Sequence, residues 1–339
     1  MTAQWQADVS LKPFNTFGID VKARYLVQAH NDADVSQALT RAAERELGVL
    51  VLGGGSNLLL TQDVDALVLH MASRGRRIVA DDGEHVLVEA EAGEPWHPFV
   101  QWTIAQGLCG MENLSLIPGT VGAAPMQNIG AYGVEIKDVF AGLTALDRQS
   151  GTLREFSLQD CAFAYRASVF KADPGRWLIL RVRFALKRTL DPHLGYGPVR
   201  QRLQEQGVEQ PTAQAISEAI CSIRREKLPD PAVLGNAGSF FKNPVVSSAC
   251  ADRIRAAYPD LVAYPQGEEG VKLAAGWLIE RAGWKGYREG DAGVHRLQSL
   301  VLVNYGQASG AQLHALAGKI QSDIRARFGV ELEMEPNLY

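Results

Sequence analysis

Two short glycine-rich segments are the part of this sequence best suited to holding a ligand. Residues 53–57 (GGGSN) directly follow a compact apolar run at 48–52, and residues 118–122 read PGTVG. Glycine permits a positive φ and lets backbone N–H groups approach a ligand, so each segment alone is either an anion-binding loop or a tight turn. One such loop fits one phosphate, whereas two fit a pyrophosphate. Together they predict a dinucleotide ligand.

The pattern of the first loop excludes two familiar nucleotide-binding motifs. It is not GxGxxG, no long helix follows at once, and it lacks the Gly-Lys-Ser/Thr of a P-loop. The second loop lies in a stretch of small residues at 117–135. Such residues cannot fill a core, and they suit a backbone that wraps closely around a flat or phosphate-bearing ligand.

From these loops onward the sequence resembles a known family. The segments GGGSN, IPGTVG (117–122) and QNIGAYGVE (127–135) resemble those of the UDP-N-acetylenolpyruvoylglucosamine reductases, also called UDP-N-acetylmuramate dehydrogenases. Four later motifs follow in the family's order over nearly the whole chain: YRAS at 165–168, KLPDP at 227–231, GSFFKNP at 238–244 and LEME at 332–335. The loop around Tyr196 and the chain length resemble the longer subtype, in which a tyrosine-bearing loop closes over the substrate.

The resemblance implies an α+β fold. Its parts are a two-part FAD-binding module of the vanillyl-alcohol-oxidase (PCMH-type) kind and a C-terminal α+β substrate domain. We expect the first FAD-binding subdomain at 1–70, joined by a C-terminal strand at 330–339. The second FAD-binding subdomain is expected at 71–228 and the substrate domain at 229–329.

The resemblance also implies a reaction, the NADPH-dependent reduction of UDP-N-acetylglucosamine enolpyruvate to UDP-N-acetylmuramate for peptidoglycan. NADPH, as co-substrate, first reduces a non-covalently bound FAD. Hydride then passes from N5 of the reduced flavin to the vinyl carbon, and Ser239 supplies a proton to the adjacent carbon.

The resemblance assigns residues to three roles. The catalytic residues would be Arg166, Ser239 and Glu335. FAD would be held by Gly53, Gly54, Gly55, Ser56, Asn57, Gly119, Thr120, Val121, Gly122, Ala123, Ile129, Gly130 and Tyr132. The substrate would contact Tyr132, Tyr196, Lys227, Asn243 and Gln298.

The chemistry of the reaction suits these residue types. Hydride addition leaves negative charge beside the substrate carboxylate, so the site needs a fixed cation and then a proton donor. The Arg166 guanidinium stays charged and binds carboxylates in a planar fork, although it could instead be a surface arginine. Ser239 could equally belong to a plain Gly-Ser turn, and Glu335 could be a solvated carboxylate at a sheet edge.

The C-terminal residues depart from the family pattern. The family continues with Val-Arg and a further strand after this glutamate, whereas here Pro336, Asn337, Leu338 and Tyr339 follow. Proline cannot donate to a sheet ladder, so we expect the strand to end at Glu335. The choice of Glu335 over Glu333 rests on the Leu-Glu-x-Glu alignment.

For Tyr196, Lys227 and His295, the surrounding sequence and the side-chain chemistry indicate what role each could have. Tyr196, in a Gly-Tyr-Gly loop, could cover the nucleotide part of the substrate as a lid or simply pack on the surface. Lys227 suits a diphosphate as a point charge. His295 is expected to be structural, because the proposed chemistry needs no imidazole.

The helices and strands predicted around these residues indicate an α+β fold. Apolar periodicity predicts helices at 32–46, 96–106, 212–227, 271–281 and 309–328. Apolar or alternating runs predict strands at 25–27, 48–52, 58–60, 66–69, 85–93, 140–147, 177–184 and 299–304, much of the middle part being antiparallel. A loop is expected at 190–198 from its prolines and glycines.

The net charge and the residue composition limit which kinds of binding partner are expected. The formal net charge is −4 and the pI is near 6.0, so no global electrostatic attraction draws the chain to nucleic acid or to an anionic membrane. The four cysteines form no CxxC pair and the histidines show no metal-ligand spacing, so no metal is expected. The N-terminal residues do not resemble a signal peptide, and we expect a cytoplasmic, monomeric protein.

Two other functions remain open from the sequence. Another flavin oxidase or dehydrogenase of the same fold would share both glycine loops but not the later motifs. A non-catalytic nucleotide-sugar-binding protein would keep the binding loops without needing Ser239 or Glu335.

Overall fold

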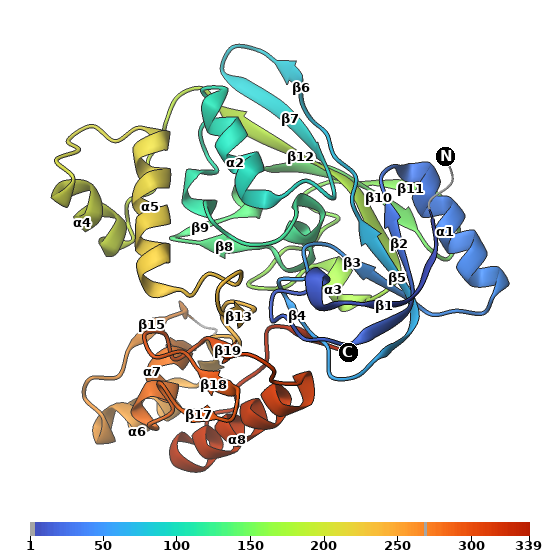
Figure 1. Cartoon of the computed structure of the whole chain (residues 1–339). Helices are drawn as coiled ribbons and strands as arrows, with labels where there is room; N and C mark the ends of the chain where they lie inside the picture. Colours follow the sequence, from blue (N-terminus) through green and yellow to red (C-terminus); the bar gives the residue numbers. More distant parts are fainter. Residues whose placement is uncertain (1–3, 268–269) are drawn as a thin grey trace. The chain divides into compact units, whose positions relative to one another are not determined.

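A computed structural model of the chain describes residues 4–267 and 270–339 (Figure 1). The chain divides into two compact units. The first comprises the chain up to Val9, Ala23–Gly54 and Val64–Glu226, and the second comprises Ser10–Lys22, Gly55–Asp63 and Lys227–Tyr339. The polypeptide therefore passes from one unit to the other inside the first glycine-rich loop. The three domains expected from the sequence, with boundaries at 70 and 228, stay a prediction.

The first unit contains a four-stranded sheet of order β1-β2-β5-β3, covered by helix α1. β5 (Val64–Met71) runs parallel to both β2 (Lys22–Ala29) and β3 (Val49–Leu52), and β1 spans Gln6–Ser10. α1 (Asp32–Glu44) begins at Asn31, whose side chain accepts a hydrogen bond from the Asp34 N–H. Its buried face, which includes Val35, Ala38 and Ala42, packs on apolar side chains of β2 and β5.

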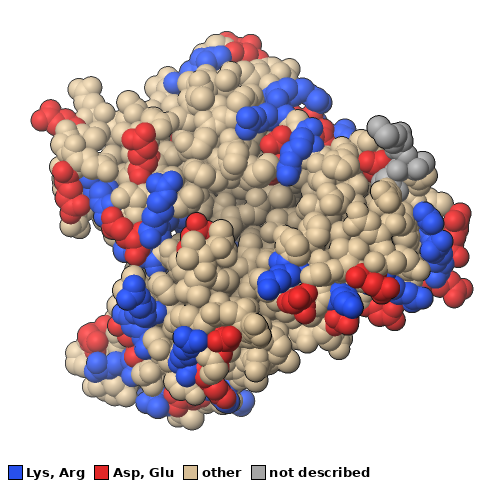
Figure 2. All heavy atoms as spheres, in the orientation of Figure 1, with Lys and Arg blue, Asp and Glu red and all other residues tan. Residues whose placement is uncertain are grey.

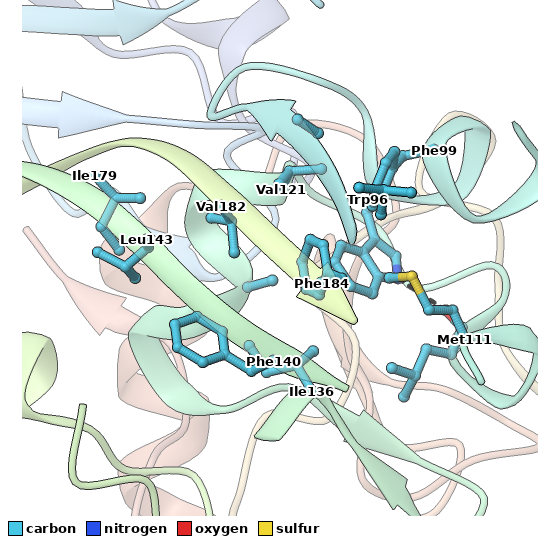
Figure 3. Close-up of a cluster of buried hydrophobic side chains, with 14 of the residues drawn as sticks. Trp96, Phe99, Met111, Val121, Ile136, Phe140, Leu143, Ile179, Val182 and Phe184 are labelled. Atoms are coloured by element: carbon cyan, nitrogen blue, oxygen red, sulfur yellow. Dashed lines mark hydrogen bonds between the residues drawn. The ribbon is translucent and has the colours of Figure 1, made fainter. Parts of the chain in front are cut away.

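A five-stranded antiparallel sheet of order β11-β10-β12-β7-β6 forms the rest of this unit's framework. Its strands are β6 (Arg76–Asp81), β7 (His85–Glu91), β10 (Phe140–Asp147), β11 (Leu153–Phe156) and β12 (Trp177–Lys187). One face packs against α2 (Trp96–Ala105) in a core that contains Trp96, Phe99 and Phe184 (Figure 3). The Trp96 indole N–H donates to the Leu114 carbonyl at 2.9 Å, so this core also holds the segment that precedes the second glycine loop.

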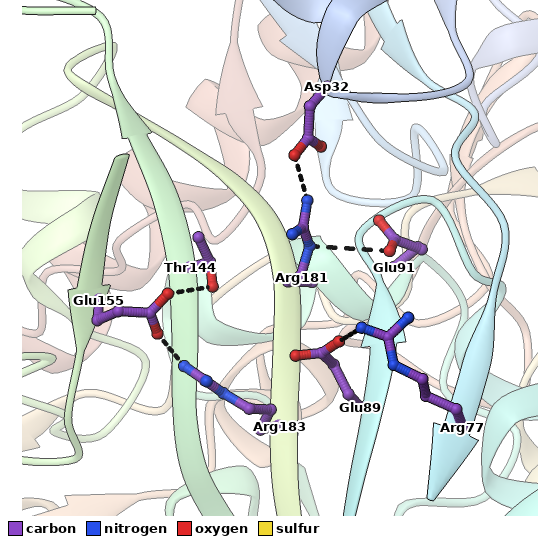
Figure 4. Close-up of polar contacts among 8 residues, drawn as sticks. All are labelled: Asp32, Arg77, Glu89, Glu91, Thr144, Glu155, Arg181 and Arg183. Atoms are coloured by element: carbon purple, nitrogen blue, oxygen red, sulfur yellow. Dashed lines mark hydrogen bonds and ion pairs between the residues drawn. The ribbon is translucent and has the colours of Figure 1, made fainter. Parts of the chain in front are cut away.

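Charged side chains of β6, β7, β11 and β12, with the Thr144 hydroxyl of β10, form ion pairs and hydrogen bonds with one another (Figure 4). Arg181 of β12 pairs with Asp32 at the start of α1, and its Nε lies 3.7 Å from a Glu91 carboxylate oxygen. Burial raises the pKa of Glu91, and the charge of Arg181 opposes that rise. Arg181 thus connects the two sheets of the first unit through α1.

Three more helices, two short strands and three 3₁₀ turns belong to the described part of the first unit. Its remaining elements are α3 (Val169–Ala172), α4 (Gly197–Glu205), α5 (Ala213–Lys227), β8 (Gly130–Ala131) and β9 (Val134–Glu135), with 3₁₀ turns η2 (Glu112–Leu114), η3 (Val121–Gln127) and η4 (Ile136–Asp138). Buried residues of α4 and α5 pack together, among them Val199, Leu203 and Ile220. The predicted helix at 212–227 is confirmed by α5.

The second unit is built on a four-stranded sheet of order β13-β19-β18-β17 and on helix α8. Its elements are η1 (Lys12–Phe14), β4 (Leu58–Leu59), β13 (Gly235–Asn236), β14 (Val245–Val246), α6 (Ser248–Ala257), β15 (Ala263–Pro265), β16 (Val271–Leu273), α7 (Ala275–Arg281), β17 (Arg288–Glu289), β18 (Ala292–Val294), β19 (Leu302–Asn304), α8 (Gly310–Phe328) and β20 (Asn337–Leu338). α8 begins with a Ser309–Gln312 capping box and ends at Gly329 with φ +67°.

The bounds of several predicted elements differ from the structure; for example, β19 covers only residues 302–304 of the strand expected at 299–304. The helix expected at 271–281 was wrong in its first part, because Val271–Leu273 forms β16 between β14 and β15 and only Ala275–Arg281 is helical. The loop expected at 190–198 ends earlier than predicted, since α4 begins at Gly197. Pro198 lies in its first turn, where the missing N–H costs no helix hydrogen bond.

The C-terminus also differs from the expectation. Met334 bridges to Phe241, and pairing is interrupted at Pro336 as proline requires. It then resumes beyond the proline, where β20 runs parallel to β4. The expectation that the strand ends at Glu335 is therefore confirmed for the segment before Pro336, whereas the separate pairing of β20 was not predicted.

Over the part of the chain that the structure describes, no helix has both the length and the apolar character needed to cross a bilayer. Figure 2 shows lysine and arginine side chains intermixed with aspartate and glutamate on the face it presents.

Candidate active site

The two glycine-rich loops meet in the first unit. A Cβ placed on Gly54 would lie 2.9 Å from the Gly119 Cα, and one on Gly53 would lie 2.7 Å from the Thr120 Oγ1. Real Cβ atoms do not come this close to other atoms, so both positions must be glycine for the loops to touch without displacement. The glycines are thus needed first for contact between the loops.

The second loop is held by the turn between β7 and α2. The Val121 N–H donates to the Glu94 carbonyl and the Gly122 N–H to the Ala92 carbonyl, both at 2.9 Å. A Cβ on Gly122 would come within 2.4 Å of the Ala92 Cβ, and the Val121 side chain is fully buried in the core of Figure 3. Val121 and Gly122 can therefore serve a ligand only through their backbone.

Backbone donors at the junction of the loops suit the phosphates of FAD. The N–H groups of Gly53, Gly54, Gly119 and Thr120 donate no hydrogen bond to any protein atom within residues 4–267 and 270–339. Polar N–H groups that fold into a tight junction without a protein acceptor are suited to an anionic ligand. These four groups, with Ala123 beside Gly53, would hold the pyrophosphate.

Arg166 and the segment at 129–132 come together in the first unit. The Arg166 guanidinium donates to the Gly130 carbonyl at 3.0 Å and also lies 5.3 Å from the centre of the Tyr165 ring. Arg166 and Tyr132 both have left-handed backbone, with φ of 54° and 51°. Such conformations are uncommon for residues other than glycine and occur often at functional sites.

Tyr132 and Tyr196, both predicted to contact substrate, pack on each other. Their ring centres are 5.2 Å apart with an interplanar angle of 88°, an edge-to-face contact. Tyr196 is 48% exposed and directly precedes α4. Burial raises the pKa of the Tyr132 hydroxyl, and the neighbouring Arg224 cation on α5 opposes that rise.

Ser239 and Glu335 lie on adjoining segments of the second unit. The Glu335 N–H donates to the carbonyl of Phe240, the residue after Ser239, at 2.9 Å. Asn57, the last residue of the first glycine-rich loop, joins them, because its carbonyl accepts from the Asn337 N–H at 3.0 Å and its amide contacts the Glu335 carbonyl at 3.5 Å. The structure thus brings together two predicted catalytic residues and one predicted FAD residue.

The two glutamates of the terminal motif have different surroundings. Glu333 is exposed and forms an ion pair with Lys242. Glu335 is half-buried on the segment beside Ser239. This difference favours Glu335 as the functional carboxylate.

The three remaining predicted substrate residues belong to the second unit, and two of them meet at the start of α7. The Asn243 side-chain oxygen accepts from the Ala275 N–H at 3.0 Å, and the Gln298 side-chain oxygen lies 3.5 Å from the position of a Cβ on Gly276. Asn243 therefore has a structural contact in addition to any contact with substrate. Lys227, the last residue of α5, is exposed.

His295 is buried at the end of β18, and its Nδ1 has no hydrogen-bond partner among the described residues. Burial lowers the pKa of His295, and the Arg296 charge lowers it further. The structural role expected for His295 stays a prediction.

Sequence reasoning missed two buried asparagines of the first unit. Asn128, with φ 46°, donates to the Glu135 carboxylate at 2.9 Å and accepts from the Lys137 N–H at 3.2 Å. Asn113 donates to the backbone carbonyls of Tyr132 and His193, each at 3.0 Å. The available signal was an amide side chain in an otherwise apolar or small-residue stretch.

Comparison with known proteins adds family matches over both halves of the chain. A family model described as "FAD binding domain" matches residues 23–157. A second, described as "UDP-N-acetylenolpyruvoylglucosamine reductase, C-terminal domain", matches residues 230–339.

Similar proteins of the same description cover the whole chain. A UDP-N-acetylenolpyruvoylglucosamine reductase of Pseudomonas putida is 78% identical over 100% of both chains. One of Chromobacterium violaceum is 53% identical over 99% of both chains. The crystal structure of the corresponding reductase from Thermus caldophilus shares the fold, with a TM-score of 0.68 and 24% identity over 100% of this chain and 99% of that one.

Proposed function

Because the chain belongs to the UDP-N-acetylenolpyruvoylglucosamine reductase family, we propose that it is an FAD-dependent enzyme that reduces UDP-N-acetylenolpyruvoylglucosamine to UDP-N-acetylmuramate. NADPH is the proposed electron donor, and the cytoplasm the proposed location. The observation that carries this proposal is the pairing of the Ser239 segment with the Glu335 segment, next to the end of a glycine-rich loop. A protein that only bound a nucleotide sugar would not need this arrangement.

Bound FAD would accept electrons from NADPH and supply hydride to the vinyl carbon of the substrate. The chain's contribution begins with position. Gly53, Gly54, Gly119 and Thr120 would hold the pyrophosphate through backbone N–H groups at the junction of the two loops. Because these loops are tightly packed, the cofactor would bind to a preformed site.

Arg166 is proposed to stabilise the negative charge that develops beside the substrate carboxylate. Its guanidinium is held by the Gly130 carbonyl, and the planar fork of a guanidinium matches the geometry of a carboxylate. A donor already in place costs no reorganisation when the charge develops.

Ser239 is proposed to deliver a proton to the carbon next to the one that receives hydride. Gly238 before it has φ +71°, and Phe240 and Phe241 after it are buried, so the serine lies at a sharp bend between anchored neighbours. Glu335, on the adjoining segment, would orient the intermediate or act as an acid.

The proposal is tested by separating the two half-reactions without oxygen. The protein with FAD is reduced with NADPH, the enolpyruvyl substrate is added, and flavin absorbance is followed. The Ser239→Ala variant should be reduced at the normal rate and reoxidise by orders of magnitude more slowly, on the order of 10² to 10⁴-fold.

The control for this experiment is Ser150→Ala, since Ser150 is exposed in the turn between β10 and β11. It should leave both half-reactions unchanged. If the wild-type flavin fails to reoxidise with this substrate, the proposed function is wrong. If Ser239→Ala slows both half-reactions equally, its role as proton donor is wrong.

A further inference from the structure

Asn113 connects two segments of the first unit that both bear a predicted substrate residue. It lies in η2, is 1% exposed, and donates through its side-chain amide to the carbonyls of Tyr132 and His193, each at 3.0 Å. Tyr132 belongs to the glycine-flanked segment of the predicted flavin site, and His193 precedes Tyr196 by three residues. One side chain therefore links the flavin segment to the tyrosine loop.

The chemistry of this contact is specific to an amide. Both acceptors are backbone carbonyls, so the side chain between them must supply two N–H donors. The Asn113 Oδ1 is buried and has no hydrogen-bond partner among the described residues. A buried amide whose donors are both used while its acceptor is idle serves to join the two carbonyls. An aspartate at this position would instead repel them.

The tyrosine loop is attached to the rest of the first unit by polar and apolar contacts. His193, Gly195 and Tyr196 are exposed, whereas Leu190 and Leu194 are partly buried and pack against the α4–α5 core. Two contacts join this loop to the segment at 129–133 or to η2: the Asn113 bond to His193 and the edge-to-face contact of Tyr196 with Tyr132. Tyr132 is itself held by the second Asn113 bond.

We propose that Asn113 is a positioning residue for the tyrosine loop: it sets residues 190–196 against the segment at 129–133, so that Tyr196 lies beside Tyr132. This inference rests on the proposed function, in which Tyr196 covers the substrate. Asn113 does not touch the reacting atoms. Its loss releases the loop and weakens substrate capture, while the electron-transfer chemistry is retained.

The test compares Asn113→Asp with a matched variant in the second unit. Asn304 is also buried and donates to two carbonyls, those of Phe17 and Ala308 at 3.0 and 3.3 Å, so Asn304→Asp has the same chemical defect without contact with the loop. Asn113→Ser provides a milder variant if the aspartate prevents folding.

The direct measurement is hydrogen exchange at the hydrogen-bonded amides of Leu194 and Val199, which donate to the Pro192 and Tyr196 carbonyls. It is made on the holoenzyme without substrate. Exchange should accelerate at least tenfold in the Asn113 variants and stay unchanged in Asn304→Asp. The KM for the enolpyruvyl substrate should rise at least tenfold, with kcat changing less than threefold. Unchanged loop exchange in both Asn113 variants overturns the inference.

A different outcome would contradict the role that the proposed function gives to Tyr196. If loop exchange accelerates while KM stays normal, the loop has moved without consequence, and the covering role given to Tyr196 is wrong together with the kinetic part of this inference. A fall in kcat equal to the rise in KM would also overturn the positioning role, because it would place Asn113 in the chemical step.

Discussion

Replacing Gly54 by alanine should separate the two loops that are proposed to hold FAD. The new Cβ would lie 2.9 Å from the Gly119 Cα and 3.2 Å from its carbonyl carbon. Carbon atoms in contact prefer about 3.5–4.0 Å, so the loops must part by about 0.6–1.1 Å. The neighbour is backbone held by Trp96, Glu94 and Ala92 and cannot rotate away as a side chain would.

The expected loss of FAD affinity can be worked out from the cost of inserting a methyl group into this contact. Inserting a methyl group into a packed site typically costs about 1–3 kcal/mol. If the loops must close against this strain to bind FAD, the cofactor Kd should increase by about 5- to 150-fold. Gly53→Ala should have a smaller effect, because its Cβ would meet the Thr120 Oγ1, an atom that can change rotamer.

FAD binding to the apoprotein, followed by the change in flavin fluorescence, measures these affinities, and urea unfolding measures the stabilities. Gly318→Ala in α8 is the matched control, since no atom lies within 4 Å of its Cβ position and glycine is unfavourable inside a helix. It should leave FAD affinity unchanged and stabilise the protein by about 0.5–1 kcal/mol.

Two results would refute the reasoning. An FAD affinity for Gly54→Ala within twofold of the wild type would show that contact between the loops is not required for the cofactor. A larger effect for Gly53→Ala than for Gly54→Ala would show that the rigidity of the neighbour does not set the cost.

Three further predictions follow from the environments of single residues. Glu335→Gln should lower kcat by about 10²–10⁴-fold. Glu333→Gln removes an exposed ion pair and should change activity less than about threefold. Equal effects of the two variants in steady-state assays would contradict the choice of Glu335 as the functional carboxylate. Burial raises the pKa of Cys161 to about 12, so iodoacetamide should label half-buried Cys250 in the native protein and Cys161 only after unfolding, as read by mass spectrometry. Burial, with Arg225 and Arg224, lowers the pKa of His97, whose Nδ1 accepts from the Leu116 N–H at 3.0 Å. The unfolded state therefore binds the proton more readily, and stability should be lost as pH falls below about 6.5; in urea unfolding at pH 7 and 5.5, His97→Gln should reduce this loss, and an unchanged loss would contradict it.

Much of the fold could be predicted where the signal is local. The helices expected at 32–46, 96–106 and 309–328 are confirmed as α1, α2 and α8, because a 3.6-residue apolar period acts within a few turns; α1 and α8 also have a capping side chain. β16 was read as helix because Val271–Leu273 runs into a genuine helix. β16 forms because it pairs with β14 and β15, and no local sequence pattern indicates such pairing.

The candidate site shows the same division. The motifs of the glycine loops, of the Gly-Ser-Phe-Phe segment and of the terminal glutamates predicted a flavin reductase through their family resemblance. The catalytic set stays a prediction. The motifs did not reveal that Glu335 lies against the segment of Ser239 or that Asn57 ends beside both. Nor did they single out Asn113, since an asparagine in a 3₁₀ turn has no meaning until its two carbonyl partners are known.

The sequence by itself determined which chemical groups this protein has and in what order. Through the two glycine-rich loops it also predicted a dinucleotide ligand. Only the tertiary structure decided why those glycines are required, because Gly53 and Gly54 are in contact with a loop far away in the sequence. The physical reason is range. Backbone propensity and capping act between neighbours along the chain, whereas steric exclusion and hydrogen-bond satisfaction act between whatever atoms folding brings together.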